Sequence, residues 1–340
     1  MKETKLGSLS FSSPLLLAPM SSICNYPFRY LMQMLGCGGT VSELVSCHGI
    51  NYQNDKTLKM LYINKNEKNV GIQLFGEDGA SMAKAAKVAQ EFGPGFIDLN
   101  LGCPVNKVVK KGGGSALLRD PSILGKFFAD IKKELNIPLT IKIRTGWDEE
   151  NINASEVINI AYNEGVEFVA IHGRTRTQQY TGKANWNLIE EIAEKSPLPI
   201  VGNGDLTSSN LIQDRLNKTN CKALMIGRGA LRHPFIFLES CNNEIRYNPQ
   251  DYLEIIKYYD YLITTYTDNN RHRLIQMKKM TVWFLAGFNG VSKFRGEIFA
   301  STEILQLLDN IEKYFYKLEQ SGKAFKDIDE NIPFMTGGHG

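Results

Sequence analysis

Short, continuous runs of apolar residues recur along the first two thirds of the chain. Eight of them read as β-strands: 15–18, 40–42, 70–74, 96–99, 139–143, 168–171, 199–201 and 223–226. Because strands that are covered on both faces are apolar throughout, this pattern predicts a parallel sheet. Segments between them, namely 80–91, 122–134, 154–163 and 186–194, carry apolar residues near helical spacing. Eight β–α units over about 240 residues predict a (β/α)8 TIM barrel, which usually takes ~250 residues.

A doubly wound sheet is the alternative architecture, because it also alternates strands with helices. Its dinucleotide-binding signature, Gly-x-Gly-x-x-Gly after the first strand, does not occur in this sequence. The stretch Gly227-Arg-Gly-Ala-Leu-Arg232 matches only half of such a motif. The pattern therefore favours the barrel.

The pattern changes after the eighth run. A polar stretch that ends at Pro249 reads as a linker. The segments 252–267, 274–288 and 303–318 then have helical spacing, with no strand-like run between them. We therefore predict a barrel domain over residues 1–244, a small all-helical domain over 245–330 and a disordered tail over 331–340.

Composition excludes several classes of protein. No apolar run approaches the roughly 20 residues that cross a bilayer, and the first apolar stretch is too short for a signal peptide, so we expect a cytoplasmic protein. The six cysteines form no Cys-x-x-Cys pair and the five histidines are scattered. We therefore expect reduced thiols and no metal site. A net charge of +3 does not by itself indicate nucleic-acid binding.

Polar residues and glycines stand where the predicted strands end. In chain order they are Pro19, Met20 and Ser21; Gln73; Asn100 and Cys103; Lys142 and Arg144; His172 and Arg174; Asn203, Gly204 and Asp205; and Gly227 and Arg228. In a barrel the carboxyl ends of all strands lie on one rim, and barrel enzymes carry their active sites there. We therefore expect these residues to form one site.

Features of this rim indicate a phosphorylated cofactor. Many barrels bind phosphate at glycine-flanked positions after the seventh and eighth strands, which correspond here to Asn203–Asp205 and to Gly227 with Arg228. Lys142 would supply fixed positive charge beside a flavin ring. Gln73 would offer both an amide donor and an amide acceptor to the edge of that ring.

Cys103 is the candidate catalytic residue. It lies in a polar loop rich in glycine and lysine, where an inert thiol has little to pack against. A thiol with an ordinary pKa of about 8.5 is mostly protonated at neutral pH. The nearby Lys107, Lys110 and Lys111 would favour the thiolate.

A basic segment lies in the predicted helical domain. Between residues 269 and 296 there is no acidic residue, and the segment contains Arg271, Arg273, Lys278, Lys279, Lys293 and Arg295, with Trp283, Phe284, Phe288 and Phe294 interspersed. Basic side chains neutralise phosphates and make binding salt-dependent. A solvated helix face over an aromatic core is the alternative interpretation.

These motifs together resemble the tRNA-dihydrouridine synthase family, and most of all its bacterial B-type enzymes. The matching stretches are Ala18-Pro-Met20, Gln73-Leu-Phe-Gly76, Asp98-Leu-Asn-Leu-Gly-Cys-Pro104, Gly114-Ser-Ala-Leu-Leu118, Ile141-Lys-Ile-Arg144, His172-Gly-Arg-Thr175, Gly202-Asn-Gly-Asp205 and Gly227-Arg-Gly-Ala-Leu231. The resemblance implies an FMN-dependent enzyme that uses NADPH to reduce the C5–C6 double bond of uridine in tRNA. It also implies a helical tRNA-binding domain after the barrel, and Phe294-Arg-Gly-Glu297 fits that pattern.

The resemblance assigns roles to positions of this chain. Pro19, Met20, Ser21, Gln73, Lys142, His172, Asn203, Gly204, Asp205, Gly227 and Arg228 would bind FMN; Cys103 would be the catalytic acid; Asn100, Arg144 and Arg174 would hold the uracil; Lys278, Lys279, Lys293 and Arg295 would contact tRNA. Asn106 departs from the family, because many relatives carry a basic residue there. We expect a monomer.

The chemistry is consistent with these roles. If reduced flavin gives a hydride to C6 of uracil, a positioned acid must deliver a proton to C5, and Cys103 is the candidate. A uridine stacked in folded tRNA must first swing out to meet the flavin. Two other functions stay open: a flavin barrel acting on a free pyrimidine, of the dihydroorotate or dihydropyrimidine dehydrogenase type, and an RNA-binding module whose barrel has lost its cofactor.

Overall fold

The computed structural model describes residues 2–241, 245–322 and 326. The predicted tail over 331–340 lies outside these described residues. The chain groups into two compact units, the first built mainly from residues 2–206 and 211–227 and the second mainly from 207–210 and from residue 228 onward. The second unit therefore starts before the linker-like stretch on which the predicted boundary at residue 245 rests.

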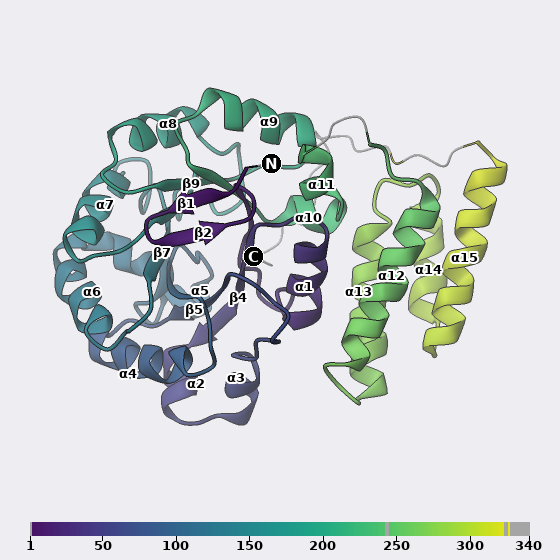
Figure 1. Ribbon diagram of the computed structural model, residues 1–340, viewed down its shortest axis with the longest axis horizontal. Coiled ribbons are helices and arrows are strands. Elements are labelled where there is room, and N and C mark those ends of the chain that lie inside the picture. Colours follow the sequence, from purple (N-terminus) through teal and green to yellow (C-terminus); the bar gives the residue numbers. More distant parts are fainter. Residues whose placement is uncertain (1, 242–244, 323–325, 327–340) are drawn as a thin grey trace. The chain divides into compact units, whose positions relative to one another are not determined.

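Eight parallel strands of the first unit close into a barrel in the order β10-β3-β4-β5-β6-β7-β8-β9 (Figure 1). They are β3 (Leu15–Leu17), β4 (Gly39–Ser46), β5 (Val70–Phe75), β6 (Phe96–Leu101), β7 (Leu139–Arg144), β8 (Val169–His172), β9 (Ile200–Asn203) and β10 (Ala223–Ile226). The predicted strands and the TIM barrel are confirmed. Strand β4 extends beyond the predicted 40–42, because it continues past the polar Ser42 and Glu43 after a register shift against β5.

Helices surround this barrel (Figure 1). They are α1 (Tyr26–Met34), α2 (Cys47–Asn51), α3 (Asp55–Lys59), α4 (Gly79–Gln90), α5 (Asn106–Val109), α6 (Leu124–Lys132), α7 (Ala154–Asn163), α8 (Trp186–Lys195) and α9 (Ser209–Lys218), with 3-10 turns at Gly114–Arg119 and Pro121–Ile123. Helix α8 shows why they form: Asn185 caps its first turn, and its buried Trp186, Ile189 and Ile192 share one face. Such an apolar face packs against the strands of the barrel.

A hairpin at the start of the chain packs on the amino-terminal end of the barrel. Its strands β1 (Thr4–Leu6) and β2 (Leu9–Phe11) pair antiparallel. The ring of Phe11 packs edge-on against those of Phe96 and Phe168, which stand where β6 and β8 begin, at centroid distances of 6.1 and 6.2 Å. A Cβ on Gly39 would lie 2.5 Å from Phe11 Cδ1, so only glycine fits there. The hairpin was not predicted, because strands of three residues give little periodicity.

The second unit is helical. It contains α10 (Arg228–Arg232), α11 (Ile236–Cys241), α12 (Pro249–Thr264), α13 (Asn270–Phe284), α14 (Val291–Ala300) and α15 (Ile304–Gln320). A capping box at Asn248 and Asp251, with Pro249 in the first turn, starts α12. Helix α14 was not predicted, because it is short and carries Gly296 in its interior. Within the described ranges, no helix is long and apolar enough to span a membrane.

Candidate active site

The register of the strands brings several of the predicted rim residues together. Gln73 on β5 lies beside Asp98 on β6, Asn100 on β6 lies beside Lys142 on β7, and His172 on β8 lies beside Asn203 on β9. These positions are near the carboxyl ends of the strands, where a barrel opens to ligands. The sequence expectation of one shared rim therefore has a structural basis.

A chain of hydrogen bonds links three of these strand residues, together with Thr140 on β7, to the Cys103 loop. Asp98 accepts from Thr140 Oγ1 at 2.6 Å and from Gln73 Nε2 at 2.7 Å. Gln73 Oε1 accepts from Asn100 Nδ2 at 2.8 Å, and Asn100 Oδ1 accepts from the backbone N–H of Cys103 at 2.8 Å. Asp98 and Thr140 were not predicted as site residues. An acid inside an otherwise apolar strand was the sequence signal that could have identified Asp98.

Cys103 is held from both sides. Its carbonyl oxygen accepts from Ser115 Oγ at 2.9 Å and from the Ser115 N–H at 3.2 Å. Gly114 makes this approach possible, because it has φ +59° and a Cβ there would lie 2.9 Å from the Cys103 oxygen. The Gly-Ser motif at 114–115 thus serves as the support of the Cys103 loop, a role that its sequence alone did not reveal.

The thiol of Cys103 is buried and protonated. The residue is 6% exposed, and burial raises the pKa of its thiol even though Arg144 and Lys142 act in the opposite direction. The nearby Lys107, Lys110 and Lys111 are exposed and are not among the groups that shift this pKa. A thiol in this state can donate a proton but is a poor nucleophile.

Lys142 places a cation beside these groups. Its Nζ donates to Asn203 Oδ1 at 3.1 Å, and the Asn203 amide in turn donates to the carbonyl of Met225 at 2.6 Å. Burial, together with the neighbouring Arg144, lowers the pKa of Lys142 to about 8, while burial raises that of Asp98 to about 6. At neutral pH Lys142 is therefore mostly charged and still able to release its proton.

Arg144 joins two loops of the rim. Its Nε donates to the carbonyl of Gly102 at 2.8 Å, and its Nη1 donates to the carbonyls of Thr175 and Gln179 at 2.7 and 2.8 Å. The guanidinium also lies 5.6 Å from the ring centre of Tyr180, a residue that the sequence did not single out. Arg144 thereby fixes the loop that carries Cys103. Its predicted contact with uracil stays a prediction.

The side chain of Arg174 is engaged by other groups of the protein. Its side chain is 3% exposed. All five of its N–H groups have partners: Asp205 takes two, at 2.8 Å each, and the others face the carbonyls of Thr181 and Gly182 and the ring of His172. The sequence could place Arg174 at a strand end, but it could not show that the Asp205 carboxylate would pair with its guanidinium. Arg174 thus supports the rim in this structure, and its predicted contact with uracil stays a prediction.

Arg174 also contacts two residues predicted to bind the cofactor, His172 and Asp205. His172 Nε2 lies 3.3 Å from Arg174 Nη1, and because a guanidinium only donates, that nitrogen is the acceptor of a neutral ring. The carboxylate of Asp205 is engaged by Arg174 and by the N–H of Ala184. Asp205 could therefore meet a phosphate only through its backbone.

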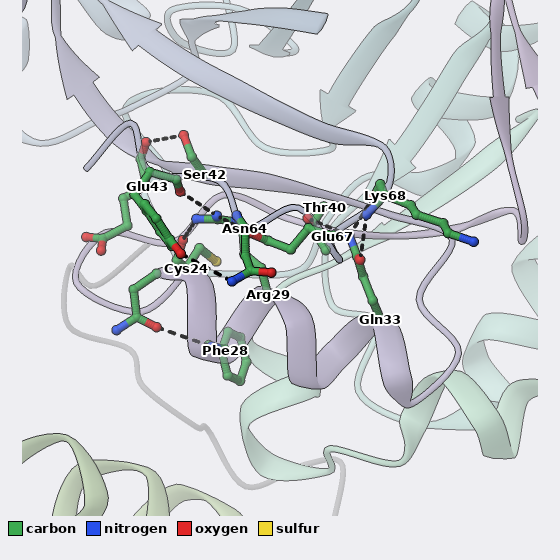
Figure 2. A network of polar contacts seen from close by, with 12 residues as sticks. Cys24, Phe28, Arg29, Gln33, Thr40, Ser42, Glu43, Asn64, Glu67 and Lys68 are labelled. Carbon is green, nitrogen blue, oxygen red and sulfur yellow. Dashed lines mark hydrogen bonds and ion pairs between the residues drawn. The ribbon is translucent and has the colours of Figure 1, made fainter. Parts of the chain in front are cut away.

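The loop after β3 contains Pro19, Met20 and Ser21, and it is anchored from behind by a buried ion pair (Figure 2). Arg29 on α1 donates to both oxygens of Glu67 at 2.8 and 2.9 Å, and to the carbonyl of Cys24 at 2.9 Å. The side chains of Arg29 and Glu67 are 1% and 0% exposed. This pair was not predicted, because Glu67 follows Arg29 by 38 positions.

The donors on this rim fit a flavin. Gln73 supplies an amide, Lys142 a cation and Asn203 a further amide, which suits a ring edge that carries both carbonyl and N–H groups. Gly204 follows β9 with φ +131°, and a Cβ there would lie 2.6 Å from the Cβ of Ala184, so only glycine fits at this turn. Gly227 ends the barrel unit, and Arg228 begins α10 of the second unit. The phosphate role of Arg228 stays a prediction.

A cationic and aromatic cluster lies on the loops next to Cys103. The guanidinium carbons of Arg119 and Arg176 lie 3.7 and 4.6 Å from the ring centre of Trp147. Arg176 also donates to Asn106 Oδ1 at 2.9 Å. Asn106, at which the sequence departs from the family pattern, thus holds the guanidinium of Arg176.

In the second unit the basic residues differ in their surroundings. Lys278 Nζ donates to the carbonyl of Phe299 at 2.8 Å, and Lys279 lies 4.9 Å from the ring centre of Trp283. Lys293 and Arg295 on α14 are exposed and make no ion pair with any described residue. Of the four residues predicted to contact tRNA, these two are the ones whose side chains are exposed.

The aromatic residues of that segment mostly form the core of the unit. Phe284, Phe288 and Phe294 are buried, and the ring of Phe294 stacks on Tyr314 at 4.3 Å. Arg273, counted in the basic segment, pairs with Asp260 of α12, with one N–O distance of 2.7 Å. The aromatic-core interpretation therefore holds for these rings, which cannot stack on RNA bases.

Comparison with known proteins identifies the family. The family model described as "Dihydrouridine synthase (Dus)" matches residues 16–319. The chain belongs to the dihydrouridine synthase family. The family consists of flavin-dependent oxidoreductases, so the chain is an enzyme. No group of three or more His, Cys, Asp or Glu side chains that could hold a metal occurs among residues 2–241, 245–322 and 326.

Similar proteins support this placement along nearly the whole chain. The chain is 34% identical to "tRNA-dihydrouridine synthase B" of Pasteurella multocida, over 92% of this chain and 95% of that protein. It is 33% identical to the protein of the same name from Pseudomonas putida, over 94% and 97%. It is 31% identical to "Probable tRNA-dihydrouridine synthase" of Rickettsia bellii, over 92% and 97%. The predicted family and its B-type resemblance are confirmed.

Solved structures share the fold. A structure of histamine dehydrogenase from Rhizobium sp. 4-9 matches with a TM-score of 0.57 at 15% identity, over 77% of this chain and 50% of that chain. A structure of 6-hydroxypseudooxynicotine amine oxidase from Pseudomonas geniculata N1 matches with a TM-score of 0.55 at 12% identity, over 71% and 49%. This chain spans about half the length of those proteins. At these identities the likeness concerns the fold alone.

Proposed function

We propose that this chain binds FMN and uses NADPH to reduce uridine in tRNA to 5,6-dihydrouridine, with Cys103 as the proton donor. The family reduces uridine in tRNA, which supports the reaction class. The observation that carries the residue assignment is Cys103 itself: a buried, protonated thiol, fixed through its backbone on both sides, on the rim that also carries Lys142 and Gln73. A general acid needs this combination of protonation and fixed position.

Each side chain then has a defined task. When bound, the reduced flavin supplies the reducing equivalents for the C5–C6 bond of uracil. Lys142 and Gln73 bind and orient the ring, with Asn203 holding the lysine in place. Cys103 keeps its proton at Sγ and delivers it to C5 of the base. Arg144 and Ser115 hold the loop that aims this sulfur.

The helical unit has a separate task in this proposal. We assign residues 1–244 to catalysis and 245–330 to tRNA binding, as the sequence indicates. Exposed Lys293 and Arg295 are the side chains with which the second unit would contact the phosphates of the RNA. A grip on the tRNA fold would hold the target nucleotide over the barrel while it is turned out of its stack.

The test separates the two halves of the reaction. Cys103→Ala should keep bound flavin and its reduction by NADPH, but the reduced flavin should be reoxidised by tRNA about 10²–10⁴-fold more slowly, the range that a general acid contributes. Cys241→Ala removes an exposed thiol of α11 and should leave both halves unchanged. Full turnover by Cys103→Ala would remove the acid role.

Two further measurements address the other functions. Equal activity on free uracil and on tRNA would favour an enzyme of free pyrimidines, and purified protein without a flavin absorbance band would favour an RNA-binding module. Nucleoside mapping of tRNA from cells that lack this protein would identify the missing dihydrouridine. Unchanged dihydrouridine content in those cells would contradict the proposed reaction.

A further inference from the structure

The hydrogen-bond chain behind Cys103 has a direction. A carboxylate only accepts hydrogen bonds and a backbone N–H only donates, whereas a side-chain amide has one end of each kind and nearly the same shape when turned around. Asp98 therefore requires the Nε2 end of Gln73, at 2.7 Å. The Oε1 end of Gln73 then requires Nδ2 of Asn100, and Oδ1 of Asn100 is left for the N–H of Cys103.

Only one orientation of the two amides satisfies every bond in this chain. Turning Gln73 would set its oxygen against the Asp98 carboxylate, and turning Asn100 would set its NH₂ group against the N–H groups of Gly102 and Cys103. Both turned states leave buried donors and acceptors unpaired, which costs more than the bonds contribute. The acceptor at one end thus decides the arrangement at the other end.

We propose that Asp98 is a positioning residue, whose buried carboxylate sets the direction of the Gln73 and Asn100 amides and thereby fixes the loop of Cys103. The inference rests on the proposed function, because it concerns the orientation of the groups assigned to flavin and to proton delivery. Asp98 itself touches neither the thiol nor a ligand. It acts through Gln73 and Asn100.

The surroundings of Asp98 support this role over simple packing. The residue is 2% exposed, and burial raises the pKa of its carboxyl group to about 6, so keeping it as an anion at neutral pH is costly. Its direct partners are the neutral side chains of Thr140 and Gln73, and the cation Lys142 acts on it through space. A residue with only a space-filling role would be served as well by an apolar side chain.

Substitutions at position 98 separate direction from charge. Asp98→Leu keeps the number and branching of the side-chain heavy atoms and removes the acceptor, so the amides lose their fixed direction. Asp98→Asn removes the charge but can still present an oxygen to Gln73, with its NH₂ group facing the Thr140 hydroxyl, which can accept. Thr140→Val is the matched control, because it removes a bond to Asp98 and leaves the acceptor for Gln73 in place.

The first readout is independent of turnover. In flavin-free protein that carries Cys241→Ser, the rate at which iodoacetamide alkylates Cys103 is followed by peptide mass. Asp98→Leu should raise that rate at least tenfold, because the loop loses its anchor, whereas Asp98→Asn and Thr140→Val should stay within about threefold of the parent. The alkylation arm remains valid even if the parent protein does not reduce tRNA, so the two proposals can fail separately.

The second readout uses the flavin-loaded protein. Reoxidation of reduced flavin by tRNA should fall at least tenfold in Asp98→Leu and by less than threefold in Asp98→Asn. An Asp98→Asn variant as impaired as Asp98→Leu would overturn the proposal in favour of a role for the charge, and wild-type rates in Asp98→Leu would overturn it outright. If Asp98→Leu does not fold, Gln73→Leu breaks the same chain at its middle, and an unchanged alkylation rate in that variant would refute the inference.

Discussion

Glu67→Gln tests how strongly the ion pair behind the β3 loop holds the barrel. The side chains of Arg29 and Glu67 are buried, and the guanidinium donates to both carboxylate oxygens at 2.8 and 2.9 Å. Removing one partner of a buried pair costs about 3–5 kcal/mol, because it leaves the other charge uncompensated. Glutamine keeps one acceptor oxygen, and the carbonyls of Cys24 and Tyr62 remain bonded to Arg29, so we expect the lower end, about 3 kcal/mol.

The assay is thermal and urea unfolding of the barrel. Three tryptophans occur in the chain, and a Trp283→Phe background leaves Trp147 and Trp186 to report on the barrel alone. For a unit of this size about 3 kcal/mol corresponds to a fall in Tm of roughly 6–12 °C. Flavin retention should fall as well, because Arg29 also holds the carbonyl of Cys24 in the loop predicted to line the flavin.

Two comparisons decide whether the reasoning is sound. Burial raises the pKa of Glu67 despite the contact with Arg29, so desolvation outweighs the attraction within the pair. The apolar double variant Arg29→Met/Glu67→Leu should therefore be within about 1 kcal/mol of wild type. Removing the exposed pair Lys87–Glu134 should cost much less than Glu67→Gln, because water and salt screen that pair. A Glu67→Gln cost no larger than that of the exposed pair would refute the account.

Three other outcomes are expected. Arg228→Ala should lose flavin on dialysis if its guanidinium binds the phosphate; unchanged flavin content would contradict that assignment. Lys293→Ala/Arg295→Ala should flatten the salt dependence of tRNA binding by about two units of slope if each side chain contacts one phosphate, whereas an unaltered slope would make α14 a solvated face. The pKa of Asp98 is about 6 in the folded protein, against an ordinary value of 3.8. Between pH 3.8 and about 6 the folded state therefore binds more protons than the unfolded state. Flavin-free wild type should therefore lose up to about 3 kcal/mol of stability, relative to Asp98→Asn, as pH rises from about 4 to about 6; parallel curves for the two proteins, from urea unfolding at each pH, would show that Asp98 is not the group responsible.

Much of the barrel could be predicted from the sequence because its strands are covered on both faces. Such strands are mostly apolar, and this made β3 and β5–β10 recognisable as short runs. The same criterion predicted a strand shorter than β4, because Ser42 and Glu43 interrupt the apolar run. It also missed the β1–β2 hairpin, whose strands are too short for any period to show.

The candidate site could be predicted in position but not in detail. Strand ends gave the rim, and with it Gln73, Cys103 and Lys142. What the sequence could not supply were partners from distant positions: Asp205 pairs with Arg174 across 31 residues, and Asp260 pairs with Arg273 from another helix. Such pairing decides whether a charged side chain is available to a ligand, and it depends on tertiary packing.

The hairpin beneath the barrel has a consequence for the order of events. Phe11, Phe96 and Phe168 fill the amino-terminal end, and the apolar layer above them continues through Leu16, Val201 and Met225. Because the amino-terminal end is filled, the proposed reaction requires both the nicotinamide and the RNA base to reach the flavin from the carboxyl-terminal end of the barrel. NADPH and tRNA would then have to bind one after the other, and steady-state plots at several NADPH concentrations should give the parallel lines of a ping-pong enzyme.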